Sequence, residues 1–493
     1  MEGAAGRGAR GRRGARSGAS RGRGAARGAA RASSRGRGVR GSPDRAVTRG
    51  AQQRDGAAAR RGCPAQGAPV PRSPPACTAA GGGEVPPAPR SRAAAARAPA
   101  AQRRVAVPDG AVAAPAAARV LPPAAGPLRL REVVSRLTLP RQDVSDAADV
   151  VNQVVSQLIQ AIRSADGSFS SIERLGAGSY YEHVKITEPN EFDIMLVMPV
   201  ARLQLDESDD TGAFYYLTFK RNPKEKYLLK FLDEDGKLSA FKMLEALRGI
   251  IKREVKNITR NIENVEVTVK RRKSGSPAIT LQIKKPPAEI SVDIILTLKL
   301  QQSWPPSTQN GLKVEQWLGR KVRQKLRYES VYLVAKQNKK EKVLRGNTWR
   351  LSFSHIEKTM LNNHGSSKTC CESGGPKCSR KSCLKLLKYL VEQLKMKHPK
   401  ELDKICSYHV KTAFFHSCVV WPNDTDWTWG DLDHCFQNYL EYFLGCLEKY
   451  QLPHFFIPQY NLLSLEDKAS CDFLSRQINQ QWNNRFPIFQ EMS

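Results

Sequence analysis

The stretch Glu-Phe-Asp-Ile-Met-Leu-Val, residues 191–197, is the most informative part of this sequence. Its apolar run predicts a β-strand over 192–197, and side chains two positions apart in a strand point to the same face. Glu191 and Asp193 would therefore lie side by side, and Asp293 would add a third carboxylate from a second apolar stretch. Three carboxylates on one face repel one another unless a cation lies between them, and Mg²⁺ prefers such oxygen ligands.

A Gly178-Ser179 pair lies about a dozen residues before these acids and predicts a turn beside them. A Glu-x-Asp pair alone is more often a solvated surface feature than a catalytic one. The Gly-Ser turn and the acid inside a hydrophobic strand favour the catalytic interpretation.

The first 130 residues differ from the rest of the chain, which has 493 residues and a net charge of +32. They hold 25 Arg, no Lys and 5 acidic residues, hence a charge of about +20, and contain no aromatic residue. A segment so poor in large apolar side chains cannot offset chain entropy by burial. We expect a disordered Arg/Gly/Ala/Pro-rich tail that binds DNA or anionic membrane lipids, or else a solubilising leader without a partner.

The cysteines are clustered, with nine of the eleven between Cys370 and Cys471 and the other two in the tail. This distribution favours a metal site and reduced thiols in an intracellular protein over a disulfide framework. No run of 18 apolar residues is present, so we expect no membrane-spanning helix, and the N-terminus lacks the apolar core of a signal peptide.

The remainder is expected to be α+β, with a catalytic lobe (131–300) that combines a mixed β-sheet and a long helix, followed by a helical lobe (301–493). Apolar residues at helical spacing predict the long helix over 142–163. Strands are predicted at 192–197, 214–219, 265–270, 279–283 and 290–298, with a hairpin turn at 273–277. Further helices are predicted at 238–258, 384–396, 407–418, 431–450 and 468–485.

A second metal site is predicted inside the helical lobe, at residues 364–378. Zn²⁺ favours one imidazole and three thiolates in a closed tetrahedral structural site, and this segment supplies His364, Cys370, Cys371 and Cys378. Adjacent cysteines are uncommon in zinc sites, so surface thiols in a loop are the alternative. Cys383 lies just beyond on the next helix and is a weaker candidate.

We call residues 364–378 the zinc knuckle. Basic residues surround it and predict binding to the phosphates of duplex DNA without sequence readout. They are Lys358, Lys368, Lys377, Arg380, Lys381, Lys385 and Lys388. A second basic run, 313–325, is either another such face or a solvated helix.

Taken together, these segments resemble the cyclic GMP-AMP synthases, a family of cytosolic DNA sensors in the nucleotidyltransferase superfamily. The resemblance covers residues 135–493 and rests on the segments 178–185, 189–193, 289–293, 348–358, 364–378 and 407–412. It implies a bilobal nucleotidyltransferase fold with a long spine helix. The Gly-Ser turn with carboxylates belongs to the whole superfamily, whereas the zinc knuckle is specific to the synthases.

The resemblance implies that Glu191, Asp193 and Asp293 hold two Mg²⁺, or Mn²⁺, and that the single Zn²⁺ is structural. ATP and GTP would be joined by two phosphoryl transfers into 2′,3′-cyclic GMP-AMP, the messenger that triggers interferon signalling in innate immunity and antiviral defence. The residues it places at the nucleotides are Gly178, Ser179, Lys336, Arg350, Ser352, Ser354, Lys388, Ser407 and Tyr408. Among these, Tyr408 would stack on a nucleobase.

The resemblance also implies partners and location. DNA would contact Arg141, Lys358, Lys381 and Lys385, and would reshape the Gly-Ser loop. Lys368 and Glu372 would join two protomers in a 2:2 complex with DNA, and Arg202 and Arg221 would dock on the nucleosome acidic patch. The protein is accordingly expected in the cytosol and nucleus, with peripheral membrane association through the tail.

The sequence departs from the family pattern at four positions, Thr138, Ala177, Ile295 and Ser379. Ala177 and Ile295 lack hydroxyls that would touch a base, Thr138 replaces a DNA-contacting lysine, and Ser379 leaves the four zinc ligands intact. Two other functions stay open: a catalytically inactive nucleotidyltransferase-fold protein that binds nucleic acid, and an oligoadenylate synthetase activated by double-stranded RNA.

Overall fold

The computed structural model describes residues 130–221, 226–272, 276–338 and 346–492. The predictions for the basic tail, including its two cysteines, and for most of the 273–277 turn concern residues outside this part of the chain. Within it, no helix combines the length and the apolar character needed to cross a membrane.

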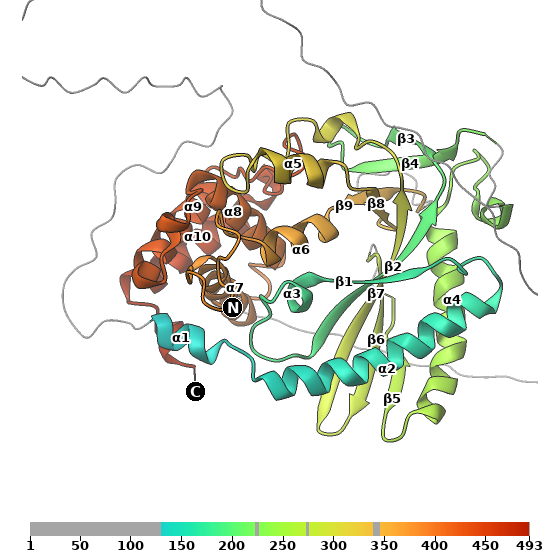
Figure 1. Ribbon diagram of the computed structural model, residues 1–493, viewed down its shortest axis with the longest axis horizontal. Coiled ribbons are helices and arrows are strands. Elements are labelled where there is room, and N and C mark those ends of the chain that lie inside the picture. Colours follow the sequence, from blue (N-terminus) through green and yellow to red (C-terminus); the bar gives the residue numbers. More distant parts are fainter. Residues whose placement is uncertain (1–129, 222–225, 273–275, 339–345, 493) are drawn as a thin grey trace, which may run out of the picture. The chain divides into compact units, whose positions relative to one another are not determined.

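One mixed sheet of nine strands forms the centre of the catalytic lobe (Figure 1). Its main path runs β1-β2-β7-β8-β9-β4-β3, and β6 joins β5 to β7. The strands are β1 Glu173–Ala177, β2 Glu191–Val200, β3 Leu203–Glu207, β4 Phe214–Phe219, β5 Glu266–Val269, β6 Ala278–Lys285, β7 Ala288–Leu300, β8 Val331–Val334 and β9 Trp349–Ser352. β2 and β7 pair in parallel, and the other pairs are antiparallel.

The lobe boundary that we expected at residue 300 is wrong, because the sheet continues beyond it. Residue 300 is only the end of β7, and β8 returns to pair with the second half of that strand. β9 then links β8 to β4, so both late strands belong to the catalytic sheet. A strand pair needs only matching backbone groups, which sequence order does not reveal.

Helices account for most of the remaining described chain. They are α1 Leu130–Arg136, α2 Arg141–Ala165, α3 Gly178–Tyr181, α4 Ala240–Asn261, α5 Arg320–Arg327, α6 Ser354–Asn362, α7 Arg380–Lys397, α8 Ser407–Val420, α9 Leu432–Glu448, α10 Lys468–Asn483 and α11 Pro487–Gln490. Short 3-10 helices occur at Lys226–Phe231, Pro306–Thr308, Asp424–Trp427, Trp429–Asp431 and Leu465–Asp467. The expected α+β architecture, with a long helix, a mixed sheet and a helical lobe, is confirmed.

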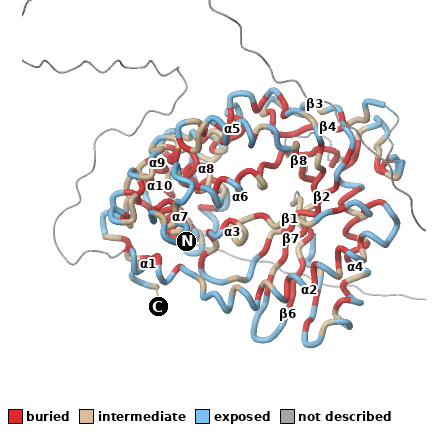
Figure 2. Tube along the Cα trace, in the orientation of Figure 1, coloured by how far each residue is buried: buried red, intermediate tan, exposed pale blue. Residues whose placement is uncertain are grey.

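The two faces of the sheet have different surroundings. Phe192, Ile194 and Leu196 of β2 pack into the main core together with buried residues of α2 and α4. Met195 and Val197, which alternate with them, belong to a small separate apolar cluster on the other face. Figure 2 shows the central strands as buried along most of their length. Because Glu191 and Asp193 share the parity of Met195, they lie on the face with the smaller cluster.

α1 connects the start of the described chain to the helical lobe. The Arg131 guanidinium donates to the carbonyl of Gly430 at 2.6 Å, and the Arg136 guanidinium to that of Met492 at 2.8 Å. α2, in contrast, packs against α4 and β7 of the catalytic lobe. The short segment between the two helices therefore passes from one lobe to the other.

Candidate active site and metal centre

The parallel pairing of β2 with β7 brings two of the three predicted carboxylates together. Asp193 and Asp293 are register partners, and Glu191 lies opposite Ser291. Register partners on adjacent strands point to the same face, and so do residues two apart within a strand. Glu191, Asp193 and Asp293 therefore share one face, as the strand pattern indicated.

Asp193 has an electrostatic environment that resists ionisation. Burial raises its pKa most, the charges of Glu191 and Asp293 raise it further, and together they bring it to about 7. The neighbouring acids have other partners: Glu191 accepts a hydrogen bond from the Lys185 ammonium at 2.8 Å, and Asp293 accepts one from the Thr280 hydroxyl at 2.6 Å. Repulsion between the carboxylates is thus built into this site, and a divalent cation would relieve it.

The Gly178-Ser179 pair lies directly against this carboxylate face. Gly178 has a φ of +73°, and a Cβ placed on it would lie 1.8 Å from Oδ2 of Asp193. Only glycine accommodates both this backbone conformation and this close approach. The pair does not form the simple turn that we predicted, because Gly178 begins the single-turn helix α3.

The three carboxylates are less tightly gathered than a closed metal site. Across the described residues, one group of at least three possible ligands has all its donor atoms within 4.8 Å of one another, and it is the His-Cys group of the knuckle. The acids nevertheless fit a metal chemically, because they provide only oxygen donors and mutual repulsion.

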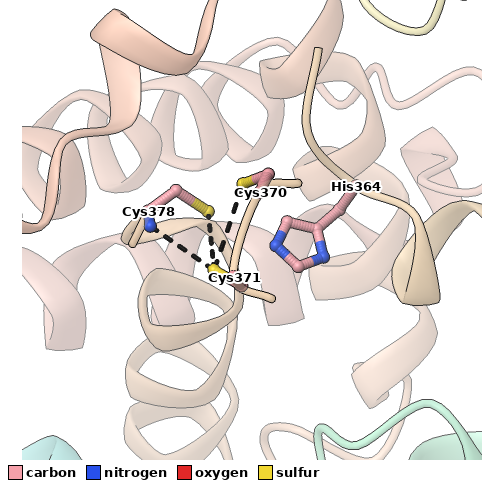
Figure 3. Close-up of side chains that lie close together, drawn as sticks. All are labelled: His364, Cys370, Cys371 and Cys378. Atoms are coloured by element: carbon pink, nitrogen blue, oxygen red, sulfur yellow. Dashed lines mark hydrogen bonds between the residues drawn. The ribbon is translucent and has the colours of Figure 1, made fainter. Parts of the chain in front are cut away.

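The four predicted zinc ligands do come together (Figure 3). The sulfur atoms of Cys370 and Cys371 are 4.0 Å apart, and those of Cys371 and Cys378 are 3.8 Å apart. A tetrahedral site with Zn–S bonds of about 2.3 Å places its sulfurs about 3.8 Å apart. The adjacent cysteines are therefore no obstacle to a common ligand position.

His364 completes this group through its Nε2 atom. Its Nδ1 lies 2.9 Å from the carbonyl of Leu361, which fixes the ring, while Nε2 is buried without a hydrogen-bond partner. An orphaned buried imidazole nitrogen beside three thiols is the arrangement expected of a zinc ligand. Burial lowers the pKa of His364 to about 4, so the ring stays neutral and its lone pair is available. The site therefore fits a structural Zn²⁺.

An ion pair at the start of α7 holds the knuckle in place. Arg380 is fully buried, and its guanidinium donates to Asp424 at 2.5 Å. Asp424 also accepts the backbone N–H groups of Ser366 and Ser367, which lie between the first two proposed ligands. A buried charge pair with several hydrogen bonds fixes a loop better than an exposed pair does.

Comparison with known proteins decides the family. Residues 180–363 match the Mab-21 protein nucleotidyltransferase domain, and residues 379–480 match the Mab-21 protein HhH/H2TH-like domain. The cyclic GMP-AMP synthase of Mus musculus is 51% identical over 368 residues, which cover 74% of this chain and 71% of that protein. The chain belongs to the cyclic GMP-AMP synthase family. It is a nucleotidyltransferase.

Other members of this family extend the comparison. The cyclic GMP-AMP synthase of Sus scrofa is 51% identical over 74% of this chain and 73% of its own length. A cyclic GMP-AMP synthase-like receptor of Magallana gigas is 24% identical over 71% of this chain and 57% of its own length.

The residues that we predicted at the nucleotides come from several elements of this chain. The hydroxyls of Ser352 on β9 and Ser354 on α6 lie 3.2 Å apart, and Arg350 is on the same strand as Ser352. Tyr408 on α8 is half-buried, and its hydroxyl donates to Glu357 at 2.9 Å. Ser407 is exposed at the start of α8, and Lys336 is half-buried two residues after β8.

Three lysines of α6 and α7 donate to the backbone of the segment that contains Gly178 and Ser179. Lys358 donates to the carbonyl of Gly176 at 3.1 Å, Lys381 to that of Glu182 at 3.0 Å, and Lys388 to that of Val184 at 2.8 Å. Burial and the charge of Lys385 lower the pKa of Lys381 to about 8. Burial likewise lowers the pKa of Lys388 to about 8, so an anion would stabilise the charged forms of Lys381 and Lys388.

The remaining predicted interface residues are at the surface. Arg141 is exposed at the first position of α2, and Lys368 and Glu372 are exposed in the knuckle. Arg202 and Arg221 are also exposed. Because Leu203 pairs with Phe219 in the β3–β4 hairpin, these two arginines flank the same end of it.

Sequence reasoning missed a buried polar network that contacts Tyr408 and the segment after Gly178 and Ser179. Lys411 of α8 donates to Glu182 at 3.0 Å and to Glu357 at 2.6 Å, and both carboxylates are almost fully buried. The ion pairs with Glu182 and Glu357 raise the pKa of Lys411 above its usual value despite burial. A lone lysine among Val410, Thr412, Ala413 and Phe414 was the available signal, since an unpaired charge is not buried in such a helix.

Proposed function

We propose that this protein is a DNA-activated nucleotidyltransferase that converts ATP and GTP into 2′,3′-cyclic GMP-AMP. The observation that carries the proposal is the pairing of Asp193 with Asp293 on the carboxylate face, directly against Gly178. The 51% identity to mammalian cyclic GMP-AMP synthases supports the choice of substrates and product.

In this proposal Glu191, Asp193 and Asp293 hold two Mg²⁺ or Mn²⁺ ions. The ions would activate the attacking ribose hydroxyl and stabilise the pyrophosphate that leaves. In each transfer the ribose oxygen gains a bond to phosphorus, the bond to pyrophosphate breaks, and the hydroxyl proton is released. The residues of the chain bind and orient the nucleotides: Ser179 and Lys388 at the triphosphate, and Tyr408 beneath a base.

DNA is proposed to bind through Arg141, Lys358, Lys381 and Lys385, without sequence preference. Two of these lysines hold carbonyls of the Gly-Ser segment, which supports a link between DNA contact and that segment. Zn²⁺ at the knuckle would fix the conformation of the loop beside this basic surface.

Further partners belong to the same proposal. Lys368 and Glu372 would join two protomers on DNA, and long DNA would favour such assemblies through multivalency. Arg202 and Arg221 would dock on the nucleosome acidic patch, and the basic tail would add contacts with DNA or anionic lipids. The protein would accordingly work in the cytosol and nucleus.

The deciding experiment incubates the full chain with ATP, GTP and Mg²⁺, with and without duplex DNA or duplex RNA. Mass spectrometry and linkage-specific nucleases identify the product. We expect 2′,3′-cyclic GMP-AMP with DNA only, and no product from the Glu191→Gln/Asp193→Asn variant, which should still bind DNA. Synthesis by that variant would refute the metal assignment.

The two alternative functions give different outcomes in this assay. Oligoadenylates made with duplex RNA would indicate an oligoadenylate synthetase, a group that lacks the knuckle. Absence of any product with either nucleic acid would indicate an inactive nucleic-acid-binding protein. The persistence of all three carboxylates and of the tight Gly178 contact argues against the inactive protein.

A further inference from the structure

His454, which follows α9 in the helical lobe, lies beside a residue of the proposed nucleotide site. This residue is 7% exposed. The imidazole packs against aromatic rings, with ring centroids 5.8 Å from Phe353, 5.9 Å from Tyr460 and 6.0 Å from Phe456. A polar ring in such apolar surroundings must satisfy both of its nitrogen atoms.

The hydrogen bonds of His454 identify which nitrogen carries the proton. Nδ1 accepts the backbone N–H groups of Phe456 and Ile457, each at 3.2 Å. A nitrogen that accepts two N–H donors cannot carry a proton of its own. Burial, with the charges of Arg350 and His416, lowers the pKa of His454 to about 3, so the ring is neutral and its one proton is on Nε2.

This proton sets the direction of a chain of hydrogen bonds. Nε2 of His454 lies 3.0 Å from the hydroxyl oxygen of Tyr408 and therefore donates to it. The Tyr408 hydroxyl then donates its own proton to Glu357 at 2.9 Å. Glu357 is only 3% exposed, and its other oxygen accepts from Lys411 at 2.6 Å, an ammonium that it shares with Glu182. The Tyr408 hydroxyl is thus held from two sides in a fixed orientation.

We infer that His454 is a positioning residue that holds the ring of Tyr408 ready for a nucleobase. The inference rests on the proposed function, in which Tyr408 is the stacking surface for a base. Anchoring the hydroxyl prevents the ring from adopting other rotamers in the empty site, so less side-chain freedom is lost on binding. The expected effect on nucleotide KM is about three- to tenfold, the cost of ordering one such side chain.

The test uses steady-state kinetics of the full chain with saturating duplex DNA. His454→Phe keeps an aromatic ring but removes all three hydrogen bonds of the imidazole, and His454→Gln restores a donor near the position of Nε2. We expect His454→Phe to raise nucleotide KM by about three- to tenfold with kcat within about twofold, and His454→Gln to recover most of the loss.

A double-mutant cycle with Tyr408→Phe separates positioning from a purely structural role. Tyr408→Phe removes the hydroxyl that His454 holds, so it should raise KM as much as His454→Phe does, and the double variant should be no worse than either single one. Additive effects, or an equal fall in kcat, would overturn the inference. If His454→Phe fails to fold, His454→Asn takes its place in the cycle, because its shorter amide keeps an acceptor near the position of Nδ1 but does not reach the Tyr408 hydroxyl. It should raise KM by itself and have no further effect in the Tyr408→Phe background.

A Tyr408→Ala variant distinguishes failure of this inference from failure of the underlying assignment. If Tyr408→Ala leaves nucleotide KM unchanged, Tyr408 is no stacking surface, and both its proposed role and the positioning role of His454 are refuted. If it raises KM while His454→Phe does not, only the role of His454 is refuted.

Discussion

Replacing Asp193 by asparagine should stabilise the metal-free protein at neutral and alkaline pH while it abolishes synthesis. The pKa of Asp193 is raised to about 7 from its ordinary value of 3.8, first by burial and then by Glu191 and Asp293. A native carboxyl with a raised pKa binds its proton more tightly than the unfolded chain does, so stability falls as pH rises from about 4 to about 7.

The magnitude follows from this difference. About 3 pKa units at about 1.4 kcal/mol each give about 4 kcal/mol as the full cost of ionising Asp193 in the folded, metal-free protein. Between pH 5 and pH 8 the ionisation of Asp193 lowers the stability of the folded protein by about 3 kcal/mol of this total. Asparagine is nearly isosteric and carries no charge, so it escapes this cost. The catalytic carboxylate is therefore expected to be retained at the expense of stability.

Urea unfolding at pH 5 and pH 8 without divalent cations measures the effect. The free energy of unfolding of Asp193→Asn, relative to that of the unaltered protein, should grow by about 3 kcal/mol from pH 5 to pH 8. Glu289 is an exposed acid at the start of β7, and Glu289→Gln should show no such growth. Mg²⁺ should stabilise the unaltered protein and leave Asp193→Asn unaffected. If the difference in free energy of unfolding between Asp193→Asn and the unaltered protein does not change with pH, the electrostatic reasoning is refuted.

Three other predictions concern single residues. Cys371→Ser should lose the one bound Zn²⁺ by elemental analysis and much of its stimulation by DNA, whereas Cys406→Ser should retain both; full zinc in the first variant would contradict the site. Gly178→Ala should lose most synthesis but bind DNA normally, because its Cβ would clash with Asp193; wild-type rates would disprove the close contact. Burial opposes ionisation of Cys406, but hydrogen bonding and charge from His409 lower the pKa of its thiol to about 6, so alkylation by iodoacetamide should already be near its plateau at pH 7; a midpoint near 9 would contradict this.

The strength of local signals explains which elements could be predicted. The strand at 214–219 was predicted with its observed ends, and helix 142–163 lies within two residues of α2, because their apolar patterns are long and regular. The short strands β1, β3, β8 and β9 were missed. Such strands of four or five residues owe their structure to pairing with distant strands, and pairing leaves no periodic pattern in the sequence.

The candidate site shows the same division. The zinc ligands were predictable because they lie within 15 residues and belong to residue types that this metal requires. The network of Glu182, Glu357, Lys411 and His454 was not, because its members come from segments up to 272 positions apart. Sequence spacing carries no information about contacts between such segments until the fold is known.

The sequence by itself determined the chemical groups of this protein: three acids in apolar strands, a Gly-Ser pair, a His-Cys knuckle and surrounding lysines. Only the tertiary structure decided that Asp193 faces Asp293, that three lysines hold carbonyls of the Gly-Ser segment, and that His454 donates to Tyr408. The physical reason is that residue type fixes charge and hydrogen-bonding capacity, whereas pKa, orientation and partner depend on which distant groups folding brings into contact.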